Sequence, residues 1–121
     1  LDRVKNSFNS YPLDRLAIRG GIAALDDVKY FNVTCKKIIQ SREKLSSDLI
    51  NLGFTVLPSV GNFLFVTHKE HDCGELALFL RKKNILIRHF DKPRIKNYLR
   101  ITIGLPEQHE HLINTIKKFI L

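Results

Sequence analysis

Apolar and polar residues alternate in the stretch YLRITIG at residues 98–104. Leu99, Ile101 and Ile103 occupy one set of alternate positions, while Arg100 lies in the other set. Because successive side chains of a strand point to opposite faces, this period of two predicts a strand with one buried face. The same pattern places Arg100 at the centre of the other face.

Short apolar runs bounded by turn residues predict three further strands. They span residues 54–58, 62–68 and 85–90, and the last run contains Arg88. If the strands that carry Arg88 and Arg100 are neighbours, both guanidiniums can reach one anion, since arginine offers a planar fork of donors to carboxylate or phosphate. The pattern alone leaves a second interpretation open, in which both arginines lie on a solvent-exposed face of an antiparallel sheet.

Spacings of three and four between apolar residues predict helices at residues 13–25, 28–52, 75–83 and 106–121. In the first of them Gly20 and Gly21 cost about 1 kcal/mol each relative to alanine. We therefore expect another segment to approach these glycines closely, or the helix to bend there. Ser10 and Pro12 are suited to its start.

The helix predicted at 28–52 carries one apolar stripe that is interrupted by Arg42. The stripe consists of Phe31, Cys35, Ile38, Leu45, Leu49 and Leu52. We expect this arginine to form an ion pair with a carboxylate. Gly53 is expected to end this helix, and Asn84 to end the helix at 75–83 in a left-handed conformation.

The predicted order of elements is α-α-β-β-α-β-β-α. This order indicates an α+β domain, with helices packed on a small, mainly antiparallel sheet. The 121 residues are enough for one hydrophobic core. Residues 1–11 are polar and rich in turn formers, as in a connector that leads into a domain at residues 12–121. Because the chain contains no methionine, we expect it to be a fragment of a longer protein.

Positive charge is concentrated in one part of the chain. The net charge is +8, and residues 81–100 carry eight lysines or arginines against one aspartate. A local positive field attracts an anion such as a phosphate, a carboxylate, a nucleic acid or an acidic partner. Arg81, Lys82 and Lys83 are better explained as a solvated helix end, where cations suit the helix dipole.

The cysteines and histidines do not predict a metal site or a nucleophile. Cys35 and Cys73 lie far apart in the sequence and are interpreted as reduced cytosolic thiols. The short clusters at 68–73 and 109–111 lack the paired spacing of a zinc site, so their histidines are interpreted as surface residues. The sequence has neither a nucleophile motif nor a glycine-rich phosphate loop, and no apolar run approaches a membrane span.

RNA binding is an alternative from a different class of function. The domain is basic, and GNFLFVTH at 61–68 loosely resembles an RNA-recognition motif, with Phe63 and Phe65 on one strand face. Leu64 stands where that motif needs a small residue, and no strand precedes the first helix. We therefore interpret both phenylalanines as core residues rather than as stacking platforms.

Three stretches together resemble the C-terminal part of histidinol-phosphate aminotransferases. They are NSFNSYPLDRLAIRGGIAAL, SREKLSSDLINLGFTVLPSVGNFLFV and ILIRHF…YLRITIG. Their most specific pieces are PS-x-x-NF at 58–63 and LRIT-x-G at 99–104. These enzymes are pyridoxal-phosphate aminotransferases with the aspartate aminotransferase fold. The resemblance implies that this chain is the small domain, with the connector from a missing large domain.

The resemblance also implies a division of roles. The lysine that forms the Schiff base and the groups that hold pyridoxal 5'-phosphate belong to the large domain, so no catalytic or cofactor-binding residue is expected here. Arg100 corresponds to the main arginine for the substrate anion, and Arg88 to a second one. The implied reaction is amino transfer between L-histidinol phosphate and 2-oxoglutarate in histidine biosynthesis. The implied full-length protein is a cytoplasmic homodimer, and this fragment is not expected to be active alone.

Two points qualify the resemblance. A related aminotransferase or a phosphothreonine decarboxylase fits the same residues, because a small domain of this kind contacts mainly the anion of the substrate. The family also places threonine or serine before the last helix, where this chain has Leu105. Leucine offers no side-chain oxygen as an N-cap, which predicts a loss of about 1 kcal/mol at the start of that helix.

Overall fold

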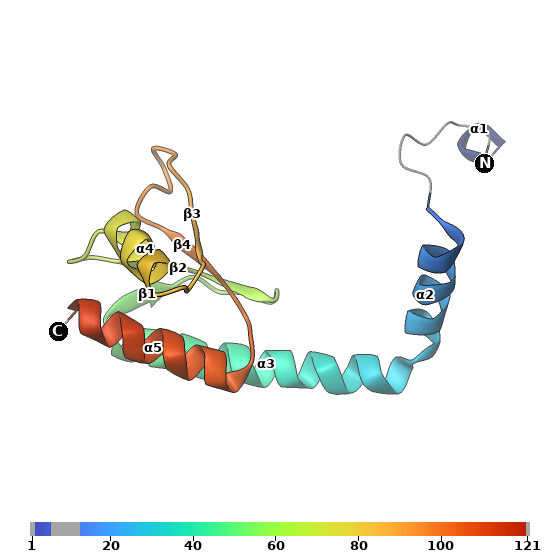
Figure 1. Cartoon of the computed structure of the whole chain (residues 1–121), viewed down its shortest axis with the longest axis horizontal. Coiled ribbons are helices and arrows are strands. Elements are labelled where there is room, and N and C mark those ends of the chain that lie inside the picture. Colours follow the sequence, from blue (N-terminus) through green and yellow to red (C-terminus); the bar gives the residue numbers. More distant parts are fainter. Residues whose placement is uncertain (1, 6–12, 121) are drawn as a thin grey trace. The chain divides into compact units, whose positions relative to one another are not determined.

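A computed structural model describes residues 2–5 and 13–120 of the chain. Within these residues it contains five helices and four strands (Figure 1). The chain divides into two compact units, Leu1–Thr34 and Cys35–Leu121, and the division falls inside a long helix. The predicted boundary between residues 11 and 12 lies outside the described residues and stays a prediction.

The first unit consists of α1 (Asp2–Lys5), α2 (Arg15–Asp26) and the start of α3 (Val28–Asn51). Asp14 is the N-cap of α2, because its carboxylate accepts a hydrogen bond of 2.8 Å from the backbone N–H of Ala17. The predicted cap Ser10 lies outside the described residues. Within them, no residue of α2 is buried, and no atom lies within 4 Å of a Cβ built on either of its glycines. The close approach expected at these glycines is therefore absent from the described part of the chain.

Helix α3 is buried only toward its C-terminal end. Leu45 and Leu49 are fully buried, whereas Phe31 is 61% exposed, so the predicted stripe does not extend along the whole helix. The ion pair predicted for Arg42 is wrong. Its guanidinium donates instead to the carbonyl of Gly61 at 3.0 Å, which ties the helix to the loop between the first two strands.

Four short strands form one antiparallel sheet in the order β1-β2-β4-β3. Their bounds are Phe54–Val56 for β1, Phe63–His68 for β2, Arg88–His89 for β3 and Leu99–Thr102 for β4. The predicted α+β class and antiparallel sheet are confirmed. Strand β3 is shorter than predicted because the chain before it completes the end of a helix, where the N–H of Ile85 bonds to the carbonyl of Leu80 at 3.0 Å.

One face of the sheet is covered by helices and holds the core. Helices α3, α4 (Cys73–Lys82) and α5 (Pro106–Ile120) contribute to it, and α5 runs beside the C-terminal half of α3 (Figure 1). The fully or nearly fully buried core residues, at 2% exposure or less, are Leu45, Leu49, Leu64, Val66, Cys73, Leu76, Leu80, Leu99, Ile101 and Ile116.

The opposite side of the sheet, here called the open face, carries the alternate residues of the strands. Phe63 and Phe65 of β2 lie opposite Thr102 and Arg100 of β4 in the register. Phe63 is 37% exposed and Phe65 is half-buried. The interpretation of these two phenylalanines as core residues is therefore wrong, because the core lies on the other face.

Two histidines are buried rather than on the surface, which corrects a second interpretation. His68 Nε2 lies 3.1 Å from the carbonyl of Leu52, and its Nδ1 accepts hydrogen bonds from the N–H groups of Glu70 and His71. His109 Nε2 accepts from the N–H of Gly104 at 2.8 Å. Burial lowers the pKa of His109. In the described residues, no three potential metal ligands come together.

The helix ends largely follow the sequence. Gly53 has φ of 85° and Asn84 has φ of 61°, as expected for residues that end helices. Leu105 precedes α5 and lacks a capping oxygen, but the side-chain oxygen of Gln108 accepts a hydrogen bond of 2.9 Å from the Leu105 N–H. This is the returning half of a capping box, so one amide at this helix start is satisfied by another residue.

Candidate anion-binding site

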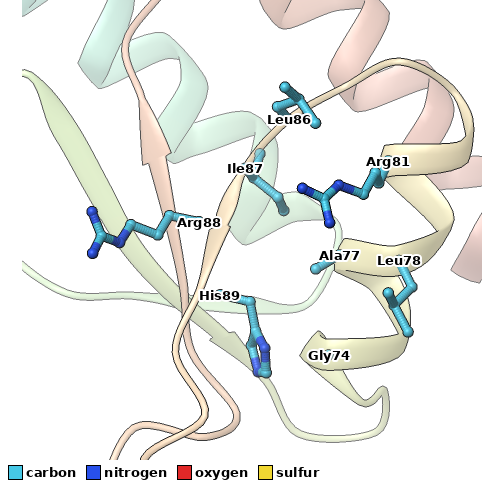
Figure 2. A pocket seen from close by; sticks show the side chains of 8 residues that line it. All are labelled: Gly74, Ala77, Leu78, Arg81, Leu86, Ile87, Arg88 and His89. Carbon is cyan, nitrogen blue, oxygen red and sulfur yellow. The ribbon is translucent and has the colours of Figure 1, made fainter.

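Arg88 and Arg100 lie directly opposite each other on neighbouring strands. They are paired in the antiparallel register of β3 and β4, which confirms that their strands are adjacent. Side chains of directly opposed residues share one face of a sheet. Figure 2 shows Arg88 projecting away from α4, whereas Ile87 and His89 lie on the α4 side of the strand. The two arginines therefore belong to the open face.

Each guanidinium lies over an aromatic ring. The Cζ atom of Arg100 is 5.4 Å from the ring centroid of Phe63, and that of Arg88 is 5.0 Å from the ring centroid of Phe90. Both distances are within the range of about 6 Å in which a cation is attracted to the face of a ring. Phe65 is paired with Arg100 in the register of β2 and β4.

Phe65 connects Tyr98 and Phe90, two other rings of the open face. It is stacked on Tyr98, with centroids 4.8 Å apart and an interplanar angle of 15°, and it meets Phe90 edge-on at 6.1 Å. Such pairs contribute about 0.5–1.5 kcal/mol beyond the area that they bury. The arginine pair thus lies beside a packed aromatic layer and not on an unstructured surface.

The charges of this pair are uncompensated within the described residues. Like charges directly opposite each other destabilise a sheet, and the one ion pair in this part of the chain joins Lys44 to Asp48, at 2.9 Å. Arg100 is half-buried, and its Nε is buried without a hydrogen-bond partner. Leaving a buried donor unpaired costs about 1–3 kcal/mol, and more for a charged group. Both guanidiniums therefore offer hydrogen-bond donors to an anion on the open face, Arg100 on the side of Phe63 and Arg88 on the side of Phe90.

The remaining basic residues of 81–100 do not join this pair. Arg81 lines a cavity of about 450 Å³ on the α4 side of β3 (Figure 2), so it lies across the strand from Arg88. Arg81 and Lys82 are exposed in the last turn of α4, as expected for a solvated helix end. Lys92, Arg94 and Lys96 are exposed in the loop before β4.

The described residues do not assemble a nucleophile. Burial raises the pKa of the Cys73 thiol, which keeps it protonated and weakens it as a nucleophile. Every lysine between residues 29 and 118 is exposed, whereas a lysine that reacts with a carbonyl is activated by an apolar, desolvated site. Among the described residues, the open face therefore offers cationic side chains and not a nucleophile.

Sequence reasoning identified the arginines but missed the rings beneath them. Phe90 is two residues after Arg88, and a spacing of two places side chains on the same face of an extended chain. Phe63 lies on β2, diagonal to Arg100 in the register. The first contact could be read from the spacing, but the second depends on the pairing of two distant segments.

Comparison with known proteins identifies the family. Residues 1–116 match the family described as aminotransferase class I and II. The chain belongs to this family. It is 56% identical over 120 residues to the histidinol-phosphate aminotransferase of Acinetobacter baylyi (strain ATCC 33305 / BD413 / ADP1), covering 99% of this chain and 33% of that protein. It is 54% identical over 121 residues to the enzyme of the same name from Acinetobacter baumannii (strain SDF), covering 100% and 34%.

This aminotransferase-family chain also has the fold of a solved relative. The structure of histidinol-phosphate aminotransferase from Sinorhizobium meliloti in complex with pyridoxal-5'-phosphate matches it with a TM-score of 0.83 and 23% identity, over 98% of this chain and 33% of that one. The chain therefore spans about a third of the length of the relatives it matches.

These findings confirm the resemblance seen in the sequence. The RNA-binding alternative is not favoured, although Phe63 and Phe65 lie on an open sheet face as stacking residues would. The same findings do not favour a different aminotransferase or a phosphothreonine decarboxylase, since the relatives at 54–56% identity are histidinol-phosphate aminotransferases by name. No helix in the described part of the chain has the length and apolar character needed to cross a membrane.

Proposed function

We propose that this chain forms the anion-binding part of the active site of a histidinol-phosphate aminotransferase. In this proposal Arg100 is the main contact to the substrate anion and Arg88 is the second. The observation that carries the proposal is the pair of opposed guanidiniums without a carboxylate partner in the described residues. The names of the relatives at 54–56% identity supply the substrate and the reaction.

The geometry is suited to a phosphate group. A phosphate ester carries up to two negative charges and three terminal oxygens, so it can accept hydrogen bonds from two guanidinium forks at once. Both arginines are always charged at physiological pH. Arg100 is the less exposed of the two and has the unpaired Nε, so an anion bound there satisfies a donor that is otherwise buried without a partner.

Binding of the phosphate end orients the rest of the substrate. Holding the anion at a fixed point restricts the position of the amino-bearing carbon, which converts binding energy into correct placement for reaction. The intact protein is proposed to transfer the amino group between L-histidinol phosphate and 2-oxoglutarate. We further propose that it functions as a cytoplasmic homodimer.

The cofactor of this reaction does not fit the residues of this chain alone. Pyridoxal 5'-phosphate serves as an electron sink and requires a lysine for its Schiff base, but the lysines between residues 29 and 118 are all exposed. We therefore propose that the cofactor is held by the part of the protein outside this chain. Orientation of the substrate is the contribution of this chain to catalysis.

The test is a comparison of arginine variants in the intact protein. We expect Arg100→Ala to lower kcat/KM for L-histidinol phosphate by about one to three orders of magnitude, because it removes charge-assisted hydrogen bonds. Arg88→Ala is expected to cause a smaller loss, since Arg88 is more exposed. Arg94→Ala removes the same charge from the exposed loop and is the matched control, with an expected effect of less than about threefold.

A second substrate makes the test specific. L-histidinol lacks the phosphate, so the loss caused by Arg100→Ala should be much smaller with this amino donor. An equal loss for both donors would show that Arg100 acts on structure rather than on the phosphate. An Arg94→Ala loss as large as that of Arg100→Ala would show that only the net charge of the domain matters.

A further inference from the structure

The two phenylalanines beneath the arginines have no role in the proposed function so far. Phe63 lies under Arg100 and Phe90 lies under Arg88, at 5.4 and 5.0 Å between guanidinium carbon and ring centroid. We propose that Phe63 and Phe90 are positioning residues, which hold the two guanidiniums at the anion site before the substrate binds. This inference rests on the proposed function, because it assumes that the arginine pair binds the substrate anion.

The first argument is the electrostatic repulsion between the two arginines. Two opposed guanidiniums repel each other, and no carboxylate among the described residues holds them in place. The face of an aromatic ring is negative, so a ring beneath each cation offsets part of this repulsion. A ring adds no negative charge of its own, and it therefore does not compete with the substrate for the arginines as a carboxylate would.

The second argument is the conformational freedom of arginine. An exposed arginine side chain has many rotamers, and restricting them on binding reduces affinity. Arg88 is exposed, so it needs such a restriction more than the half-buried Arg100. A ring face attracts the cation without accepting its N–H groups as a carboxylate would, so these groups can still donate to an anion.

The third argument is that one of the two rings is itself held by other rings. Phe90 meets Phe65 edge-on, and Phe65 is stacked on Tyr98. This row of aromatic contacts fixes the position of Phe90 under the more exposed arginine. Phe63 instead lies on β2, whose backbone pairs with the strand that carries Arg100. Phe90 is thus held by other rings, and Phe63 is positioned by the pairing of its strand with β4.

The experiment is a set of double-mutant cycles in the intact protein. Phe63→Leu and Phe90→Leu keep an apolar side chain but remove the ring, and each is expected to raise KM for L-histidinol phosphate about two- to tenfold with kcat little changed. Phe63→Leu should have no further effect in an Arg100→Ala background, and Phe90→Leu none in an Arg88→Ala background. Phe63→Tyr and Phe90→Tyr retain a ring face, and each should have the same KM as the original protein.

Two readouts separate positioning from a general loss of structure. The KM for L-histidinol, which lacks the phosphate, should not change in any ring variant. Phe79→Leu is the matched control, because Phe79 also carries a cation over its ring, Lys83 at 6.0 Å, but belongs to α4, on the other side of the sheet. The Tm of each variant, measured in parallel, reports on folding.

The outcomes distinguish this inference from the proposed function. If Arg100→Ala has no effect on the phosphate substrate, the proposed function of the site is wrong. If Arg100→Ala impairs binding but the leucine variants do not, the positioning role is wrong. It is also wrong if a leucine variant still raises KM after the arginine over the replaced ring has been changed to alanine. Failure of the tyrosine variants to restore KM, with an unchanged Tm, would also contradict it.

Discussion

Replacement of Arg100 by methionine tests whether the site is strained in the absence of an anion. The substitution keeps a long, unbranched apolar stem but removes the charge opposed to Arg88 and the unpaired Nε. Relief of the like-charge pair is worth about 0.2–1 kcal/mol, and removal of a buried unpaired donor about 1–3 kcal/mol. The lost contact with Phe63 costs about 0.5–1 kcal/mol. We therefore expect Arg100→Met to stabilise the chain by about 1 kcal/mol.

The assay is denaturant unfolding of this chain, with the free energy of unfolding extrapolated to water. Arg42→Met is the matched control, because Arg42 is also half-buried in the second unit but donates to the carbonyl of Gly61. Its removal should destabilise by about 1 kcal/mol, so the two variants should change stability in opposite directions. Added phosphate should stabilise the original chain and not the Arg100→Met variant, through linkage of binding to folding. Equal destabilisation by both substitutions would refute the reasoning and assign Arg100 a structural role.

Three further predictions concern stability. Gly53→Ala should destabilise the chain by about 2–4 kcal/mol in denaturant unfolding. The reason is that Gly53 has a φ of 85° and an added Cβ would lie 2.8 Å from His68 Nε2. Gly61→Ala is the control and should be nearly neutral, because the nearest atom to its added Cβ is 3.6 Å away. Gly20→Ala should increase helical circular dichroism and stabilise α2 by up to about 1 kcal/mol, because nothing lies within 4 Å of the added methyl group; a loss of helix would contradict this. Burial lowers the pKa of His109 in the folded chain, so the unfolded state binds more protons and stability should fall as the pH drops through about 6.5 toward the folded pKa. His109→Gln should weaken this dependence in unfolding measured between pH 8 and pH 5, and an unchanged slope would show that other groups cause it.

The periodicity of the sequence was sufficient to predict all elements from α2 onward, but not their exact lengths. Helix ends at Gly53 and Asn84 could be predicted because left-handed residues are few and have a strong preference for them. The start of strand β3 could not be predicted, because the apolar residues 85–87 are compatible both with a strand and with the turn that closes a helix. Helix α1 has only four residues, which is too short for any helical period to appear.

The face of the sheet that is covered could not be predicted from alternation alone. A period of two shows that Phe63 and Phe65 share a face with Arg100 once the register is known, but not which face the helices cover. Both sets of alternate residues in β2 are apolar, since Leu64 and Val66 occupy the other set. The sequence therefore does not distinguish the buried face of this strand from its open face. This is why Phe63 and Phe65 were assigned to the core.

The adjacency of Arg88 and Arg100 could be predicted because an arginine in an apolar strand is conspicuous and the two strands are separated by one loop. Their direct opposition, however, depends on the turn of the loop at 91–97, where the N–H of Ile95 bonds to the carbonyl of Lys92 and that of Tyr98 to the carbonyl of Ile95. A register shifted by one residue would place one arginine on the core face. This loop therefore determines whether the arginine pair exists.

A pair of like charges without a carboxylate partner among the described residues is costly for a small domain. Marginal stability makes a loss of about 1–2 kcal/mol significant, and such losses are typical of sites selected for binding. The aromatic rings reduce this cost without neutralising the arginines, because they supply attraction but no carboxylate. On the proposed function, Phe63 and Phe90 thus let the chain keep two free guanidiniums for a phosphate. A carboxylate in either position would stabilise the free chain and occupy the donors that the substrate needs.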